Sequence, residues 1–260
     1  MFSRKTVCYV TGASRGLGES IALNFAGRFP EGSLFVLLAR NGSDLEAVKN
    51  RLLQKAPTAR ALVRVFDQGT LDQRAFESVF SETLESAGAK AADFEQAILV
   101  NNAGSIKPIV FVRNLPAVEE LSKYLNVNVA GVISLTSQFL RTFQSSMSRA
   151  VINISSLGAV QPFKSWAMYC SGKAARDMFF SVLAGEEEDV RVLNYAPGPL
   201  QTDMSNLLVE SEDEGVRTWA KQAKAENQLL SCDTSVNKLI QILEKDSFKS
   251  GAHIDFYDEI

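Results

Sequence analysis

Apolar and polar residues follow two alternating patterns along the chain. Short, nearly continuous apolar runs such as TVCYV (residues 6–10) and LFVLLA (residues 34–39) are typical of buried strands. Longer segments between such runs carry apolar residues at helical spacing, as in residues 19–29. The pattern predicts strands at residues 6–10, 34–39, 62–66, 98–100, 150–154, 190–194 and 252–256, and helices at residues 19–29, 44–54, 75–86, 117–143, 166–184 and 235–244.

This alternation predicts a single α/β domain over residues 1–260. Its fold is a doubly wound, Rossmann-type sheet of seven mostly parallel strands with helices on both faces. No Pro/Gly/Ser linker or change of composition divides the chain. The polar stretch 204–227 interrupts the rhythm, and we expect it to form a lid over a substrate. A plain surface excursion is the alternative.

The composition and net charge of the chain argue against several classes of function. The hydrophobic fraction of 46% and the charged fraction of 22% are those of an ordinary globular protein. A net charge of −3 gives no reason to expect nucleic acid or an anionic membrane as a partner. The N-terminal apolar run is a strand rather than a signal peptide, and no run approaches the roughly 18 apolar residues of a membrane span.

The cysteine and histidine content adds two expectations. Three widely spaced cysteines form neither a disulfide framework nor a zinc motif, so we expect a reducing compartment, the cytoplasm. The single histidine excludes a multi-histidine metal site, and we expect no metal.

The first strand runs into TGASRGLGES, residues 11–20. Gly12 permits a tight turn, Gly16 lets the backbone approach a phosphate, and Gly18 lets helix and strand pack closely. The helix N-terminus adds unpaired N–H groups for an anion. The spacing GxxxGxG differs from GxGxxG, and a purely structural turn is the alternative. The loop indicates a dinucleotide site.

The end of the second strand indicates which dinucleotide binds. NAD sites usually present an acidic residue there, but this chain has Arg40 and Asn41. Arg40, together with Arg15 in the loop, suits a 2′-phosphate, although either arginine alone is also an ordinary surface residue. We therefore predict NADP(H) over NAD(H). Asp67, after the third strand, is placed to accept from the adenine amino group.

The reacting groups are predicted from the segment WAMYCSGK. On a helix, Tyr169 and Lys173 share one face. The lysine ammonium and a positive nicotinamide ring would lower the tyrosine pKa from about 10. Ser155 and Ser156, after the fifth strand, supply a hydroxyl for a substrate carbonyl. The tyrosine–lysine pair is a weak signal alone, but it gains strength beside a glycine loop and the segment NNAG at residues 101–104.

The chain resembles the short-chain dehydrogenase/reductase family in five motifs taken together. These are TGxxxGxG, NNAG, the asparagine of NVNVAG, Ser-Ser followed by YxxxK, and PGPLQTDM. Further segments, including LLARN, VINISSLGAVQPFKSWAMYCSGKAARDMFF and LEKDSFKSGAHIDFY, resemble those members that reduce carbonyls in pterin side chains. The resemblance implies an NADPH-dependent reductase of a small pterin substrate in tetrahydrobiopterin synthesis. It also implies a homodimer formed through helices 117–143 and 166–184, whose apolar faces are equally compatible with ordinary core.

The resemblance also implies residue roles. Tyr169 would donate the proton, and Lys173 would bind the nicotinamide ribose. Ser156, with Ser155 beside it, would orient the carbonyl, and Asn128 would complete a proton relay through water. Gly198 would lie near the substrate. The cofactor would contact Gly12, Ala13, Ser14, Arg15, Gly16, Leu17, Gly18, Arg40, Asn41, Asp67, Gln68, Asn102, Ala103, Gly104, Tyr169, Lys173, Leu200, Gln201, Thr202, Asp203 and Met204.

The last strand carries a carboxylate, Asp255, between Ile254 and Phe256. A pterin presents a 2-amino group and N3–H side by side, and one carboxylate accepts from both. The resemblance assigns this anchoring role to Asp255; a solvated terminal carboxylate is the alternative. His253 is expected to be structural. Three aromatic residues are candidates either for the wall of a ring-binding pocket or for the core: Phe163, Trp166 and Trp219.

Two other functions stay open. One is a short-chain reductase of another small ketone or dicarbonyl. The other is a non-catalytic NADP-binding sensor, which the intact serine, tyrosine and lysine set disfavours because binding alone needs no acid.

Overall fold

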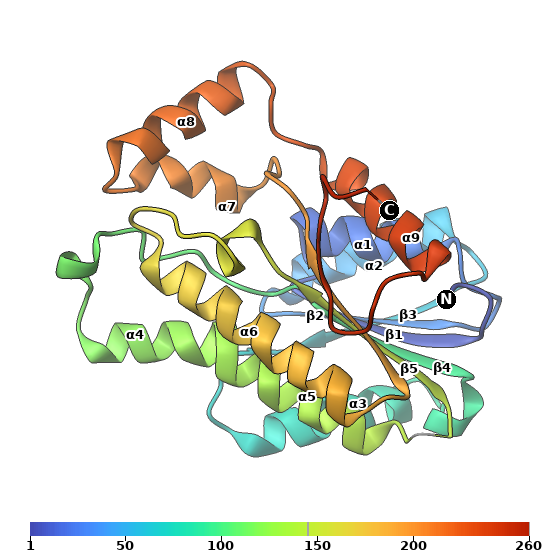
Figure 1. Ribbon diagram of the computed structural model, residues 1–260. Coiled ribbons are helices and arrows are strands. Elements are labelled where there is room, and N and C mark those ends of the chain that lie inside the picture. Colours follow the sequence, from blue (N-terminus) through green and yellow to red (C-terminus); the bar gives the residue numbers. More distant parts are fainter. Residues whose placement is uncertain (145, 260) are drawn as a thin grey trace.

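A sheet of seven parallel strands forms the centre of the molecule (Figure 1). The computed structural model describes residues 1–144 and 146–259. The strands are β1 (Thr6–Thr11), β2 (Leu34–Ala39), β3 (Arg60–Val65), β4 (Gln96–Asn101), β5 (Ser148–Ile154), β6 (Val190–Ala196) and β7 (His253–Asp255). Their order is β3-β2-β1-β4-β5-β6-β7, with every neighbouring pair parallel. The order reverses between β1 and β4, and this reversal places a ligand crevice at the carboxyl ends of the strands.

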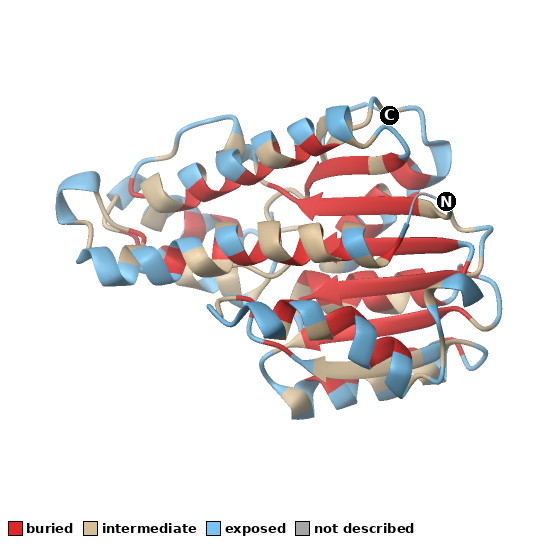
Figure 2. Ribbon diagram, turned by 90° about the horizontal axis from the view of Figure 1, so that it is seen from below, coloured by how far each residue is buried: buried red, intermediate tan, exposed pale blue. Residues whose placement is uncertain are grey.

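Helices cover both faces of this sheet. They are α1 (Gly16–Ala26), α2 (Gly42–Lys55), α3 (Gln73–Ser86), α4 (Val118–Leu125), α5 (Gly131–Thr142), α6 (Ala167–Glu186), α7 (Asp203–Asn206), α8 (Glu214–Ala225) and α9 (Cys232–Lys245). Successive strand residues point to opposite faces. Cys8 and Val10 pack toward α1, α2 and α9, whereas Val7 and Tyr9 pack toward α3, α5 and α6. Figure 2 shows most of the strands as buried, whereas the edge strand β3 is mostly intermediate.

The predicted doubly wound α/β fold is therefore confirmed, with all seven strands in one sheet. The strand boundaries shift by a few residues: β3 begins at Arg60 rather than at residue 62, and β7 spans only His253–Asp255. Across the described ranges, no helix combines the length and the apolar composition that crossing a membrane requires.

The predicted long helix over residues 117–143 is present as continuous helical backbone over 118–142, but its geometry changes in the middle. A π-helical turn, Asn126–Ala130, separates α4 from α5. Two amides hold this turn: Asn128 Nδ2 donates to the Tyr124 carbonyl at 3.0 Å, and Gln68 Nε2 donates to the Val127 carbonyl at 2.7 Å. The hydrophobic pattern of a helix cannot reveal such a turn, because Gln68 lies far away in sequence. π-Turns of this kind are frequent at functional sites.

The stretch 204–227 is mostly helical and is fastened to the loop after β4. A 3₁₀ turn, Leu207–Glu210, follows α7 and precedes α8. The Glu212 carboxylate accepts from the Phe111 N–H at 2.7 Å and from Asn114 Nδ2 at 3.0 Å. Lys107 and Glu210 form an ion pair at 2.5 Å. This stretch is therefore held over the carboxyl ends of the strands, beside the loop at residues 105–114.

The π-turn also explains why α5 begins with glycine. A Cβ atom on Gly131 would collide with the Gln68 carbonyl oxygen, whereas a Cβ on the exposed Gly185 of α6 would meet nothing. We expect Gly131→Ala to lower the free energy of unfolding by about 2 kcal/mol through overpacking. The matched Gly185→Ala should raise it by about 0.5–1 kcal/mol through helix propensity. Urea denaturation followed by circular dichroism measures both, and changes of the same sign would contradict this explanation.

Candidate active site

The carboxyl ends of the strands open into a cavity of about 1880 Å³. Pockets for small ligands usually measure about 300–1,000 Å³, so this cavity has room for a dinucleotide and a second molecule. All but two of the residues predicted to bind cofactor or substrate, or to act in catalysis, line it. The exceptions are Ala13, whose side chain is wholly buried in the core, and Gly18, which packs against the Gly12 carbonyl.

The glycine loop forms one end of the cavity. Gly12 and Gly16 have φ values of +64° and +59°, in the left-handed region that favours glycine. Asn102 Nδ2 donates to the Thr11 carbonyl at 2.8 Å, so the asparagine ties this loop to the end of β4. The nearest atom to a Cβ on Gly16 would be Thr202 Cγ2, at 3.6 Å across the cavity. The open backbone and the adjacent start of α1 therefore fit a pyrophosphate.

Arg40 and Arg15 differ in their surroundings. Arg40 is exposed on the cavity wall and forms no ion pair with any described residue. Arg15 Nε instead lies 3.3 Å from Asp203 Oδ2, joining the glycine loop to the start of α7. Asn41, next to Arg40, caps α2 by accepting from the Ser43 and Asp44 N–H groups. Of the two predicted phosphate-binding guanidinium groups, only Arg40 is thus unpaired.

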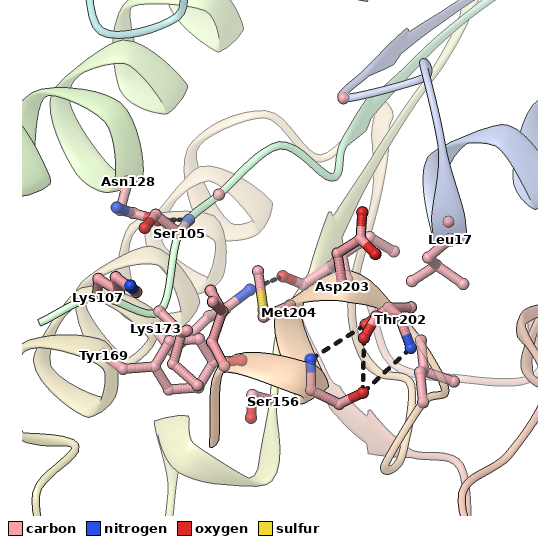
Figure 3. Close-up of a pocket in the computed structure, with 18 of the residues that line it drawn as sticks. Leu17, Ser105, Lys107, Asn128, Ser156, Tyr169, Lys173, Thr202, Asp203 and Met204 are labelled. Carbon is pink, nitrogen blue, oxygen red and sulfur yellow. Dashed lines mark hydrogen bonds between the residues drawn. The ribbon is translucent and has the colours of Figure 1, made fainter. Parts of the chain in front are cut away.

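Tyr169, Lys173 and Ser156 meet at the other end of the cavity (Figure 3). Tyr169 and Lys173 lie on one face of α6 and are only 8% and 7% exposed. Lys173 Nζ donates to the Ile154 carbonyl at 2.6 Å and lies 5.6 Å from the centre of the Tyr169 ring. Lys173 thereby links the face of α6 that carries Tyr169 to the end of β5, immediately before Ser155 and Ser156.

Burial controls the acidity of these two groups. It raises the pKa of the Tyr169 phenol above the ordinary value, while the Ser156 hydroxyl and the Arg176 guanidinium partly oppose it. Burial also lowers the pKa of Lys173 well below its ordinary value; Arg176 adds to this effect and Asp177 opposes it. The expected lowering of the Tyr169 pKa is therefore not seen in the protein alone, because desolvation outweighs the nearby cations.

Asn128 sits in the π-turn on the same side of the cavity (Figure 3). Its Oδ1 accepts from the Ser105 N–H at 2.8 Å, and its Nδ2 donates to the Tyr124 carbonyl. The side chain is 3% exposed. Its Oδ1 therefore ties the turn to the loop that follows NNAG, and its Nδ2 ties the turn to the preceding α4.

The two predicted serines have different roles in the structure. Ser155 Oγ donates to Asp177 Oδ1 at 2.6 Å, which turns its hydroxyl toward α6. Asp177 accepts further bonds from Asn153 Nδ2 at 3.1 Å and from His253 Nδ1, whose distance to Oδ2 is 2.6 Å. The expectation that the Ser155 hydroxyl serves a substrate is thus not supported, and only Ser156 presents one to Tyr169.

Sequence reasoning overlooked Asp177 and Arg176. Asp177 lies eight residues after Tyr169 and four after Lys173, so helical spacing alone places all three on one face. Arg176 is 1% exposed and donates to Asn153 Oδ1 at 2.8 Å and to the Asn101 carbonyl at 2.6 Å. These groups connect α6 to the ends of β4 and β5.

Asp255 lies on the cavity wall rather than on a free tail. Strand pairing holds it beside Ala196, and its Oδ1 accepts from the Tyr257 N–H at 3.0 Å. No described residue hydrogen-bonds to its Oδ2. Part of the cavity wall is aromatic and apolar. Its members include Phe163, Trp166, Trp219, Gly198 and Leu208.

The His253–Asp177 pair generates a pH prediction. The hydrogen bond to Asp177 raises the pKa of His253 above the usual value of about 6.5. Because the folded-state pKa is the higher one, this stabilisation is fully present below about pH 6.5 and is lost as pH rises through the folded-state pKa. We expect urea unfolding to show a stability decrease over an interval that begins at about pH 6.5 and extends upward, and His253→Asn to reduce this decrease. A wild-type stability that rises over this interval would contradict the pairing.

Known proteins share both the sequence and the fold. A model of the short chain dehydrogenase family matches residues 6–213. Sepiapterin reductase from Meriones unguiculatus is 43% identical over 258 residues, covering 97% of this chain and 96% of that protein. Sepiapterin reductase from Rattus norvegicus is 40% identical over 257 residues, with coverage of 97% and 96%. The crystal structure of the KRED1-Pglu enzyme superposes with a TM-score of 0.81 at 24% identity, covering 96% of this chain and all of that one.

Proposed function

The chain belongs to the short-chain dehydrogenase family, and from this premise we propose that it is an NADPH-dependent reductase of pterin side-chain carbonyls. Its reactions would convert sepiapterin to dihydrobiopterin and 6-pyruvoyl-tetrahydropterin to tetrahydrobiopterin, as steps of tetrahydrobiopterin synthesis. The observation that carries the proposal is the presence of Asp255 in the same cavity as Ser156 and Tyr169. A carboxylate there suits the paired N–H groups of a pterin, and the likeness to sepiapterin reductases supports the same substrate.

The cavity fits the nicotinamide cofactor that the family implies. The glycine loop and the start of α1 would hold the pyrophosphate, and the unpaired Arg40 would bind the 2′-phosphate. Asp67 would accept from the adenine amino group. Lys173 would bind the nicotinamide ribose, and the segment 200–204 would close over the cofactor. When bound, NADPH supplies the hydride for the carbonyl carbon.

The chain's own groups supply orientation and the proton. The Ser156 hydroxyl donates a hydrogen bond to the substrate carbonyl oxygen and stabilises the negative charge that develops there. The buried Tyr169 phenol has a raised pKa and stays protonated until this charge draws its proton onto the oxygen. Asn128 and a water molecule would return a proton to the tyrosine through Lys173. The product is an alcohol with one added hydride and one added proton.

Residues 204–227 would act as the lid of this site. Leu208, Val216 and Trp219 from this stretch line the cavity, and Lys107–Glu210 and the Glu212 hydrogen bonds hold it closed. A closed lid excludes water and strengthens the electrostatic contacts to the developing oxyanion.

Two further parts of the proposal concern the protein's setting. All three cysteines are free thiols, which supports a reducing compartment such as the cytoplasm. A homodimer would cover the exposed apolar side chains on the outer faces of α4 and α6. These are Val118, Leu125, Met178 and Val182, which are 67%, 42%, 67% and 49% exposed.

Cofactor preference is tested by Arg40→Asp. We expect the Kd for NADPH to rise at least about tenfold, because the 2′-phosphate loses its cation and meets a carboxylate. The Kd for NADH should change little or fall. Fluorescence titration of both cofactors measures the ratio, and an unchanged preference for NADPH would refute the role of Arg40.

The substrate is tested by steady-state NADPH oxidation with sepiapterin and with a small diketone. We expect efficient sepiapterin reduction by the wild type. Asp255→Asn should lower kcat/KM for sepiapterin about 100-fold, because the amide can no longer accept from both pterin N–H groups. The diketone has no such pair of N–H groups, so kcat/KM for the diketone should fall less than about threefold.

Other outcomes separate the alternatives. Equal decreases in kcat/KM for both substrates would show that Asp255 does not anchor the pterin and is only a solvated carboxylate. A wild type that reduces diketones well and sepiapterin poorly would indicate a reductase of other small carbonyls. Tight NADPH binding without turnover of any carbonyl would indicate a sensor.

A further inference from the structure

The protein's only histidine lies two residues before Asp255 on β7. His253 Nδ1 is 2.6 Å from Asp177 Oδ2, and the side chain is 21% exposed. Its Nε2 is buried and has no hydrogen-bond partner among the described residues. The contact with Asp177 is therefore the polar interaction that orients the ring.

The Asp177 carboxylate joins three parts of the site. It belongs to α6, the helix that carries Tyr169 and Lys173. One of its oxygens accepts from Ser155, the neighbour of Ser156, and the other meets His253 on β7. A single buried carboxylate thus connects the proton donor's helix, the carbonyl-orienting segment and the strand that bears Asp255.

Strand β7 is held mainly through its backbone, by pairing with β6 and by the Ser181 hydroxyl of α6, which donates to the Gly251 carbonyl just before the strand. It is three residues long, lies at the sheet edge and pairs only with β6. Within β7, Ile254 is apolar and the Asp255 side chain bonds only to the following turn among the described residues. Among the described residues, His253 is the one whose side chain links β7 to α6 by a hydrogen bond.

We propose that His253 is a positioning residue, which holds the substrate-anchoring strand β7 in register with the proton-donating helix α6. The inference rests on the proposed function, in which Asp255 holds one end of the substrate and Tyr169 acts at the other. Reaction requires atoms to approach to about 3–3.5 Å, and a misplacement of about 1 Å costs on the order of 100-fold in rate. Register therefore matters most for a substrate that is anchored at both ends.

The charges around His253 favour its protonated form. Asp177 faces it from α6, Asp255 follows on β7, and Asp258 lies in the next turn. Three cations of α6 and α9 have hydrogen-bond partners other than His253. Arg176 donates to Asn153 and to the carbonyls of Asn101 and Ala103, Lys173 donates to the Ile154 carbonyl, and Lys238 of α9 donates to the Asp258 carbonyl. When His253 is protonated, its hydrogen bond to Asp177 is charge-assisted, and such bonds are shorter and stronger than neutral ones.

Two substitutions separate positioning from general stability. His253→Phe keeps a ring of similar size but removes the donor, whereas His253→Asn keeps an N–H close to the position of Nδ1. For His253→Phe we expect kcat/KM for sepiapterin to fall about tenfold, with kcat/KM for a small diketone within about twofold of wild type. NADPH affinity should be unchanged, and His253→Asn should recover most of the sepiapterin activity. Each rate is divided by the measured concentration of NADPH-binding sites, so that unfolded protein does not lower the apparent activity of a variant.

The outcomes are distinct. Equal losses on both substrates, or no loss on either, would overturn the positioning role while leaving the proposed function intact. Failure of the wild type itself to reduce sepiapterin would contradict the proposed function, and this inference would fall with it. If His253→Phe does not fold, His253→Gln is judged by the same substrate ratio, because it displaces the donor by one carbon while remaining polar.

Discussion

The site depends on a set of buried hydrogen bonds that fasten α6 to the carboxyl end of β5. Lys173 donates to the Ile154 carbonyl, Arg176 to Asn153, and Ser155 to Asp177. Three charged groups are thereby taken out of water, which is tolerated only because each one is hydrogen-bonded. A hydrogen bond to a charged group typically contributes about 1.5–3 kcal/mol, and a movement of α6 would break several of them, so α6 has little freedom to shift. The positions of Tyr169 and Ser156 relative to each other follow from this constraint.

The same burial shapes the chemistry. A phenol in water would be a poor partner for a carbonyl, because solvent would compete for every hydrogen bond. Here Tyr169 is nearly inaccessible, its pKa is raised, and the stretch 204–227 lies over it. Hydroxyls and cations in such a low-dielectric site act more strongly on a developing oxyanion than they would in water.

Much of this arrangement could be predicted from the sequence. The alternation of apolar runs with segments of helical spacing predicts the parallel sheet. Because parallel strands all end at one edge of the sheet, the residues that follow each strand are predicted to line the crevice. The spacing of Tyr169 and Lys173 places both on one helical face. Local pattern could not reveal contacts between distant segments. The π-turn depends on Gln68, the Ser155 hydroxyl turns toward Asp177, and Arg15 pairs with Asp203 instead of remaining free. Each depends on a partner that only the folded chain brings near.

The role of Tyr169 as proton donor is the central claim, and Tyr169→Phe tests it most directly. Single-turnover NADPH oxidation with sepiapterin should slow by at least about 100-fold, because the ring is kept and only the acidic hydroxyl is lost. The Kd for NADPH should stay within about twofold of wild type. Turnover retained near the wild-type rate, with NADPH still bound, would contradict the assignment of Tyr169 as the proton donor.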